Sequence, residues 1–152
     1  MNNVIVIAEA GPNHNGKIRL AYKLVDIAKK CGANFVKFQT SVPENHISKF
    51  AKKAVYQLKN TSRNKSQLEM SKKMTLSFND FKLLNKYCKR KKINFLSTPF
   101  DQESIDFLKK FKMKYYKIPS GEITNLPYLI KIAKLRKKIL LSTGMSNINE
   151  IS

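Results

Sequence analysis

The sequence predicts an α/β protein built on a parallel sheet, and two observations carry this prediction. Short apolar runs bounded by turn residues alternate with longer segments whose apolar residues recur at helical spacing, and this unit runs four times and begins a fifth. The 152 residues are 42% apolar, which is enough for one domain with a hydrophobic core. Strands that are separated by amphipathic helices pair in parallel through right-handed crossovers.

The first unit begins with a continuous apolar strand. This strand is expected from Val4 to Ala10, and residues 11–16, which are rich in Gly and Asn, form the turn after it. A helix follows and ends near Gly32. The apolar residues that share one face of this helix are Ile18, Ala21, Leu24, Val25 and Ala28. The second strand is expected from Phe35 to Thr40.

A long polar segment separates the second strand from the next helix of the repeating pattern. Residues 43–73 are rich in Lys, Asn, Ser and Gln, and they are too many for an ordinary loop between a strand and a helix. We expect an excursion that is partly helical near residues 66–74. Long loops over a sheet usually carry function or close a site.

The later units are marked by helix start signals. Ser77 and Asp80 have the spacing of a capping box, so a helix is expected from there to about Lys92. Asn125 and Pro127 open another helix in the same way. The remaining elements are expected in the order strand 94–99, a helix through Ile105, Leu108 and Phe111, strand 115–119, the helix that Asn125 opens, and strand 138–143.

The charge of the chain is strongly positive, with 30 Lys and Arg against 10 Asp and Glu. Such an excess is typical of proteins that bind nucleic acid. Only four of the basic residues are arginines, however, and bidentate recognition of bases and phosphates favours arginine. We therefore expect no nucleic-acid partner, and we expect the field to favour a small anionic substrate.

The chain carries no segment that predicts a membrane span, and its few cysteines do not form a motif. Its longest early apolar run is far shorter than the roughly 18 residues that a membrane helix needs. Cys31 and Cys88 lack the spacing of a metal or redox motif, so both are expected to be reduced and structural. These features predict a cytoplasmic protein without a membrane partner.

Polar side chains stand at or near the end of every predicted strand. They are Glu9, Lys37, Gln39, Ser97, Thr98, Lys117, Ser120, Ser142 and Thr143. The carboxyl ends of parallel strands are where barrels and doubly wound sheets build their sites. The alternative is that each of these residues is a satisfied core polar group or a strand-end cap.

The residue types of this set indicate anion chemistry. Two lysines and several hydroxyls beside the turns at Gly121 and Gly144 suit a phosphate and a carboxylate together. Glu9 and Glu122 are the acids available for proton transfer. Lys37 or Lys117 could instead form a Schiff base, although the surrounding hydroxyls favour anion binding. No complete metal site is visible, and His14 is expected to be a loop or substrate contact.

Five ordered motifs resemble the bacterial sialic acid synthase family, N-acetylneuraminate synthase. They are IAEAGPNHNG at 7–16, VKFQT at 36–40, STPFD at 97–101, YKIPSGE at 116–122 and LSTGM at 141–145. The resemblance implies a (β/α)8 TIM barrel, of which residues 1–152 supply about the first five strands and four helices. The family's C-terminal antifreeze-like domain is then expected to be absent from this chain.

The same resemblance implies a function and a set of site residues. Family members condense phosphoenolpyruvate with N-acetylmannosamine or a related hexose, release phosphate and form a nonulosonic acid. The positions that match phosphoenolpyruvate contacts are Lys37, Gln39, Thr98, Lys117, Ser120 and Ser142. Glu9 and Glu122 match acidic positions that orient the sugar and assist proton transfer.

The resemblance also implies a divalent metal, Mn²⁺ or Mg²⁺, whose ligands are expected beyond residue 152, and a homodimer at full length. The chain alone is then expected to be inactive. Two alternatives stay open, a phosphoenolpyruvate-dependent synthase of another 3-deoxy sugar acid and a non-catalytic basic binding fragment. The sequence does not choose the acceptor hexose.

Overall fold

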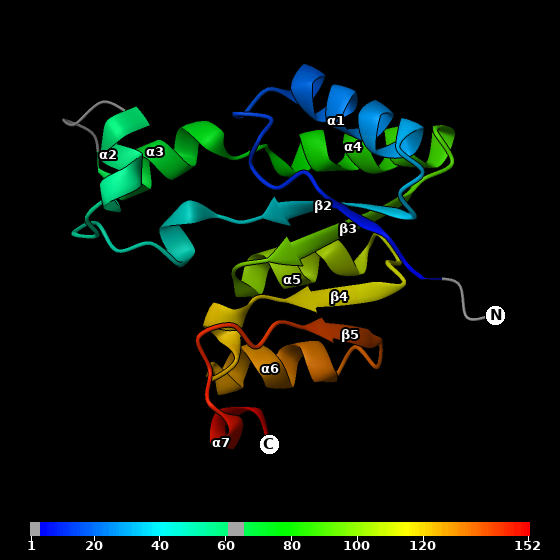
Figure 1. Ribbon diagram of the computed structural model, residues 1–152. Helices are drawn as coiled ribbons and strands as arrows, with labels where there is room; N and C mark the ends of the chain where they lie inside the picture. Colours follow the sequence, from blue (N-terminus) through cyan, green and yellow to red (C-terminus); the bar gives the residue numbers. More distant parts are fainter. Residues whose placement is uncertain (1–3, 61–65) are drawn as a thin grey trace.

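The computed structural model describes residues 4–60 and 66–152, and its strands all run parallel. The strands are β1 (Ile7–Glu9), β2 (Phe35–Thr40), β3 (Asn94–Pro99), β4 (Tyr115–Ile118) and β5 (Lys138–Leu141). One ladder has the order β1-β2-β3, and a second ladder joins β4 to β5. β4 lies beside β3, so the strands follow one another in chain order (Figure 1). The predicted α/β class is confirmed.

Helices connect the strands and lie against the sheet. The regular helices are α1 (Ile18–Lys30), α2 (Val55–Asn60), α3 (Gln67–Met74), α4 (Phe78–Arg90), α5 (Gln102–Lys109), α6 (Leu126–Ala133) and α7 (Ile148–Ile151), with 3₁₀ turns at Pro43–Asn45 and Ser120–Glu122. Figure 1 shows α1 beside α4, and α2 and α3 at the edge of the molecule. In the part of the chain that the structure describes, no helix is long and apolar enough to span a membrane.

The predicted helix start signals are present as hydrogen bonds. Ser77 and Asp80 form a reciprocal capping box at the start of α4. Ser66 and Glu69 form a second one at the start of α3, so the helix expected within the excursion is confirmed. The Asn125 side chain accepts from the backbone N–H of Tyr128 and caps α6. These caps satisfy backbone donors that have no partner within their own helix.

The alternation of side chains along the strands divides the sheet into a helix-covered face and an opposite face. Val36, Phe38 and Thr40 of β2 are fully buried on the helix-covered face, together with helix residues such as Val25 and Phe81. Lys37 and Gln39 therefore point to the opposite face. The register pairs Lys37 with Leu96 and Gln39 with Thr98, so these four residues share that face.

The first strand is shorter than its sequence predicts. The ladder between β1 and β2 begins with Ile7 opposite Phe35, and Val4 before it is 83% exposed. The Asn34 side chain accepts the backbone N–H of Val6 at 2.7 Å, and the backbone N–H groups of Asn34 and Phe35 both donate to the Val6 carbonyl. Val6 therefore contacts the start of β2 without extending the ladder. Among the described strands, β1 pairs with β2 only. The apolar run that predicted this strand begins at Val4, three residues before the first paired residue, Ile7.

Candidate active site

Lys37 is the buried centre of a polar cluster at the carboxyl ends of the strands. Its Nζ lies 2.9 Å from Oε2 of Glu9 on β1 and donates to Oγ1 of Thr98 on β3 at 3.4 Å. A buried ammonium without such partners would cost several kcal/mol. The fold therefore brings three of the predicted site residues together from three adjacent strands.

Lys117 on β4 extends this cluster toward β5. Its Nζ donates to the hydroxyl of Ser142 and to the carbonyl of Ile118, the second at 2.7 Å. Burial lowers the pKa of Lys117, the nearby charge of Lys37 lowers that pKa further, and Glu9 opposes both effects. Two ammonium groups thus influence each other beside a single carboxylate. We call Glu9, Lys37, Thr98, Lys117 and Ser142 the lysine cluster.

Glu9 differs from its predicted environment. Its position after five apolar residues predicts a buried carboxylate, but 63% of its side chain is exposed. The reason is that Glu9 ends an edge strand of the described sheet, with a neighbour on one side only. Its cationic neighbour is Lys37. Among the described residues, the Glu9 carboxylate is thus exposed to solvent while it pairs with Lys37.

Two of the predicted residues belong to the turn after β4. Ser120 begins this turn and lies against Gly144 in the loop after β5, because a Cβ at Gly144 would stand 3.7 Å from the Ser120 hydroxyl. Glu122 accepts a hydrogen bond of 2.6 Å from the Asn125 side chain. Among the described residues, no hydrogen bond or ion pair joins the Glu122 side chain to the lysine cluster.

Ser97 shows that one polar strand-end residue has a structural role. It lies on the helix-covered face, where its hydroxyl and that of Thr40 share a hydrogen bond of 2.7 Å. Thr98, the next residue, points to the opposite face and meets Lys37. The alternative that the sequence left open, a satisfied core polar group, therefore holds for Ser97.

Gln39 lines a separate hollow of about 320 Å³ beside the lysine cluster. Its amide lies next to the turn at Gly11, where an added Cβ would stand 3.9 Å from Nε2. None of the twelve described residues around this hollow is Asp, Glu, Lys or Arg, and we call it the neutral pocket. Its lining is Pro12, His14, Gln39, Ser41, His46, Gln57, Gln67, Met70, Ser71, Met74, Thr75 and Phe100.

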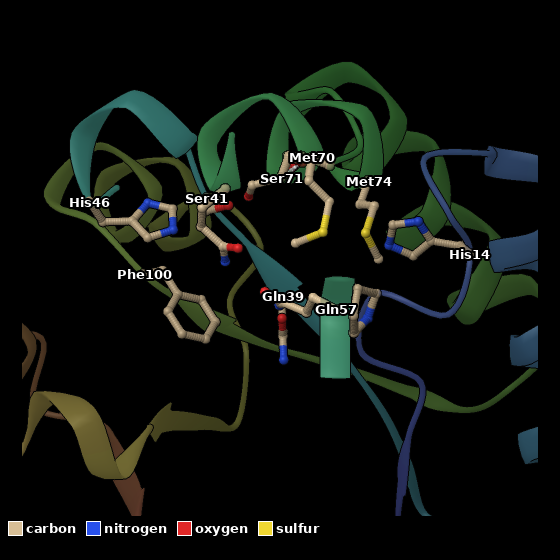
Figure 2. A pocket seen from close by; sticks show the side chains of 12 residues that line it. His14, Gln39, Ser41, His46, Gln57, Met70, Ser71, Met74 and Phe100 are labelled. Atoms are coloured by element: carbon tan, nitrogen blue, oxygen red, sulfur yellow. Dashed lines mark hydrogen bonds between the residues drawn. The ribbon is translucent and has the colours of Figure 1, made fainter. Parts of the chain in front are cut away.

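The neutral pocket has walls from five parts of the chain, which are the turn after β1, the end of β2 with the segment after it, α2, α3 and the residue that follows β3. Figure 2 shows Met70 and Met74 projecting from α3 into the hollow, with His14 at one end and His46 with Phe100 at the other. The sequence reasoning did not identify Ser41, Gln67 or the two methionines as site residues. The unusual length of the excursion is a signal that could have drawn attention to Gln67 and Met70.

His14 is buried in the wall of the neutral pocket in an uncharged state. It is 2% exposed, and its Nδ1 accepts the backbone N–H of Gly16 at 3.1 Å. Burial lowers the pKa of His14, and the charge of Asp80 opposes this effect. A neutral ring that accepts at Nδ1 carries its proton on Nε2. The expected loop residue is thus also part of a pocket wall.

The described residues do not offer a ligand set for a metal. Within 4–60 and 66–152, no three His, Cys, Asp or Glu side chains come together in a way that could hold an ion.

The two cysteines have different environments. Cys31 is exposed, whereas Cys88 is buried, and burial raises the pKa of its thiol to about 12. Both cysteines are free, as their spacing predicts.

Comparison with known proteins gives a consistent result. Residues 24–152 match the NeuB family. N,N'-diacetyllegionaminic acid synthase of Campylobacter jejuni is 57% identical over 151 residues, which are 99% of this chain and 45% of that protein. The enzyme of the same name from Legionella pneumophila is 46% identical, and the match covers 96% of this chain and 41% of that enzyme.

A solved structure supports the same assignment. The crystal structure of N-acetylneuraminic acid (sialic acid) synthetase from Leptospira borgpetersenii, in complex with citrate, superposes with a TM-score of 0.82 at 31% identity. The match covers 99% of this chain and 48% of that one. This chain therefore spans less than half the length of the relatives it matches. The motifs, the fold and these matches together show that the chain belongs to the NeuB family.

Proposed function

We propose that this chain serves in a nonulosonic acid synthase that condenses phosphoenolpyruvate with an acetamido hexose and releases phosphate. The observation that carries the proposal is the lysine cluster, in which Lys37 and Lys117 meet the hydroxyls of Thr98 and Ser142 at the carboxyl ends of β2 to β5. We also propose that the strands belong to a (β/α)8 barrel, which their parallel order in the chain supports.

The lysine cluster suits both anionic ends of phosphoenolpyruvate. The two ammonium groups can each hold one end, the carboxylate or the phosphate, through charge-assisted hydrogen bonds. The mutual influence of Lys37 and Lys117 means that an added anion would relieve repulsion between them. Ser120 stands beside Gly144 near the Ser142 end of this cluster and can add a hydroxyl. Gln39, on the same face as Lys37, is a further proposed contact of phosphoenolpyruvate and stands at the border of the neutral pocket.

The reaction joins two carbon skeletons and adds one water. The π electrons of phosphoenolpyruvate form the new bond to the aldehyde carbon, and the aldehyde oxygen takes up a proton. Water then adds to the cationic carbon and loses a proton. The bond from that carbon to the phosphate oxygen breaks as the new hydroxyl becomes the ketone carbonyl, and the proton of that hydroxyl passes to the departing phosphate. Glu9 is placed to move these protons because it is exposed and paired with Lys37. Glu122 is a second candidate, although it contacts Asn125 in this structure.

The divalent metal implied by the family stays a prediction. The described residues do not form its ligand set, so no step here depends on it. The homodimer and the cytoplasmic location also stay predictions, as does the inactivity of residues 1–152 alone.

The acceptor that we propose is a hexose with two acetamido groups. Two relatives, at 57% and 46% identity, are N,N'-diacetyllegionaminic acid synthases, whereas the sialic acid synthetase is 31% identical. Phosphoenolpyruvate contains no nitrogen, so both N-acetyl groups of such a product must come from the sugar. N-Acetylmannosamine, which carries one acetamido group, is the second candidate.

A Schiff-base mechanism is the alternative for the lysines, because a lowered pKa helps an amine to attack a carbonyl. The hydroxyls of Thr98 and Ser142 beside the two lysines favour anion binding instead. We expect borohydride, added with phosphoenolpyruvate or the sugar, to leave Lys37 and Lys117 unmodified. A trapped adduct on either residue, found by mass spectrometry, would establish the imine mechanism.

The direct test is phosphate release by the whole protein at its natural length. Phosphoenolpyruvate is supplied with Mn²⁺ and either the diacetamido hexose or N-acetylmannosamine, and the product is identified by its mass. We expect phosphate only when a sugar is present, together with a nine-carbon acid. Phosphate without sugar, or no phosphate with either sugar, would contradict the proposal.

A further inference from the structure

We propose that the neutral pocket binds an acetamido group of the acceptor, the one that distinguishes a diacetamido hexose from N-acetylmannosamine. This inference rests on the proposed function and assigns a specificity role to residues of α3. Gln67 is the acceptor for the amide N–H of that group, and Met70 and Met74 contact its methyl.

The position of the pocket is the first argument. Gln39 lines the pocket, and it stands two residues after Lys37 on the same face of β2. Successive residues on one face of a strand are about 7 Å apart. A ligand that reacts beside Lys37 therefore reaches the pocket if it extends by roughly the length of a hexose. The pocket is on the open, carboxyl side of the strands, from which Glu9 is also reached.

The chemistry of the lining is the second argument. A charged substituent would lose its hydration here without meeting a charged partner, which is costly. An acetamido group is neutral and carries one donor, one acceptor and one methyl. Glutamine and serine side chains match its polar atoms, and the flexible thioethers of Met70 and Met74 suit a methyl group. A volume of about 320 Å³ is enough for such a substituent but is at the lower limit for a whole ligand.

The third argument is an acceptor that lacks a partner. Oε1 of Gln67, the first residue of α3, is buried and has no hydrogen-bond partner among the described residues. Leaving a buried acceptor unpaired costs free energy, so such groups usually have a partner, including a bound ligand. The ligand amide N–H supplies the missing donor.

His14 offers the complementary contact from the lining of the same pocket. Its Nδ1 already accepts from Gly16, so its Nε2 carries the proton and can donate to the acetamido carbonyl. Burial keeps the ring neutral by lowering its pKa. The pocket thus provides an acceptor, a donor and an apolar surface, which are the three features of one acetamido group.

Binding is tested by methyl NMR of the protein labelled with ¹³C at its methionine methyls. The whole protein is titrated with the diacetamido hexose and, separately, with N-acetylmannosamine. We expect the diacetamido sugar to shift the Met70 and Met74 signals more than N-acetylmannosamine does. Met113, which is buried near the other end of β4, is the internal control and should not move. Equal shifts with both sugars, or none, would overturn the inference.

Specificity is tested with Gln67→Leu. We expect KM for the diacetamido sugar to rise roughly tenfold, the loss of about one hydrogen bond, while KM for phosphoenolpyruvate and for N-acetylmannosamine stays unchanged. Gln102→Leu is the matched control, because Gln102 is also the first residue of its helix and is exposed. Both variants should keep the melting temperature of the wild type.

The outcomes separate the inference from the proposed function. If the wild type releases no phosphate with either sugar, but the diacetamido sugar still shifts Met70 and Met74, the proposed reaction is wrong and the pocket assignment holds. If the enzyme is active and Gln67→Leu raises both sugar KM values equally, or neither, the reaction holds and the pocket assignment is wrong.

Discussion

The lysine cluster and the neutral pocket are neighbours on one face of β2, yet they have opposite chemistry. Lys37 belongs to the first, and Gln39, two residues later, lines the second. The cluster gathers two ammonium groups and one carboxylate, whereas the described lining of the pocket carries no Asp, Glu, Lys or Arg. In a chain with a net charge of +20, attraction of an anion is general. Selection of a neutral sugar substituent requires a pocket without charged side chains, such as the neutral pocket.

The largest effect is expected from Glu9→Gln in the lysine cluster. This change removes the proposed proton-transfer group and should lower turnover by about 100-fold or more. The melting temperature should change little, because the amide oxygen of the introduced glutamine can still accept a hydrogen bond from the buried Lys37 ammonium, and the Glu9 side chain is 63% exposed. Turnover and thermal unfolding of the whole protein check both expectations.

The matched control is Glu44→Gln. Glu44 is also an exposed carboxylate paired with a lysine, Lys72, but it lies in the excursion outside the cluster. Its loss should leave turnover unchanged. A Glu9→Gln variant that unfolds, or one that is as active as the wild type, is incompatible with a catalytic role for Glu9.

Lys117→Met sharpens the comparison by changing only the anion site. Removing a charge-assisted contact costs about 1.5–3 kcal/mol, so KM for phosphoenolpyruvate should rise about 10- to 150-fold. The sugar-induced shifts of the Met70 and Met74 methyls should persist, because Lys117 does not line the neutral pocket. Lys91→Met, which removes a lysine paired with Asp26 on the outer helices, serves as the control. Loss of the methionine shifts in Lys117→Met would mean that the two regions are one site.

The smallest effect is expected from the titration of His14 in the pocket wall. Its pKa in the folded chain is lowered from the ordinary 6.5, with burial as the main cause. Between the folded pKa and 6.5 the unfolded chain binds more protons than the folded chain, so the free energy of unfolding increases with pH in this range. Stability should therefore be complete above about 6.5 and decrease as the pH falls below it.

Urea unfolding measured from pH 7.5 to 5.5 checks this expectation. His14→Leu should reduce the slope of stability against pH, whereas the slope should persist in His46→Gln, which removes an exposed histidine. An unchanged slope in His14→Leu would show that another group titrates. The experiment also tests whether the pocket wall needs an uncharged ring.

The elements of the fold were predictable where local signals exist. The capping boxes at Ser66 and Ser77 mark helix starts through hydrogen bonds between residues three positions apart. The first residue of β1 was not predictable, because it depends on a partner that is distant in the sequence. The strand begins where Ile7 pairs with Phe35, and the Asn34 side chain accepts from the residue before it, Val6. The exposure of Glu9 has the same origin, since hydropathy does not tell an edge strand from a central one.

The sequence predicted which residues belong to the candidate site better than it predicted which of them contact one another. Strand alternation placed Lys37 and Gln39 on one face, and the fold then separated them between two regions. The roles of Ser97 and Thr98 could not be distinguished by type, because adjacent strand residues point to opposite faces and only the packing shows which face is covered. The Gln67 and Met70 contacts depend on how the excursion folds back over β2, for which the sequence has no periodic signal.

Gly16 closes the turn that carries His14, and its backbone is adjacent to the end of α3. It has φ of +70°, and a Cβ there would stand 2.2 Å from the carbonyl oxygen of Lys73. The tolerance of this position to mutation is therefore determined by a distant segment as well as by its own turn. In a saturation library, every replacement of Gly16 should be depleted, and residues such as Asn that normally accept positive φ should not be spared. Loop grafting between relatives would have to move both segments together.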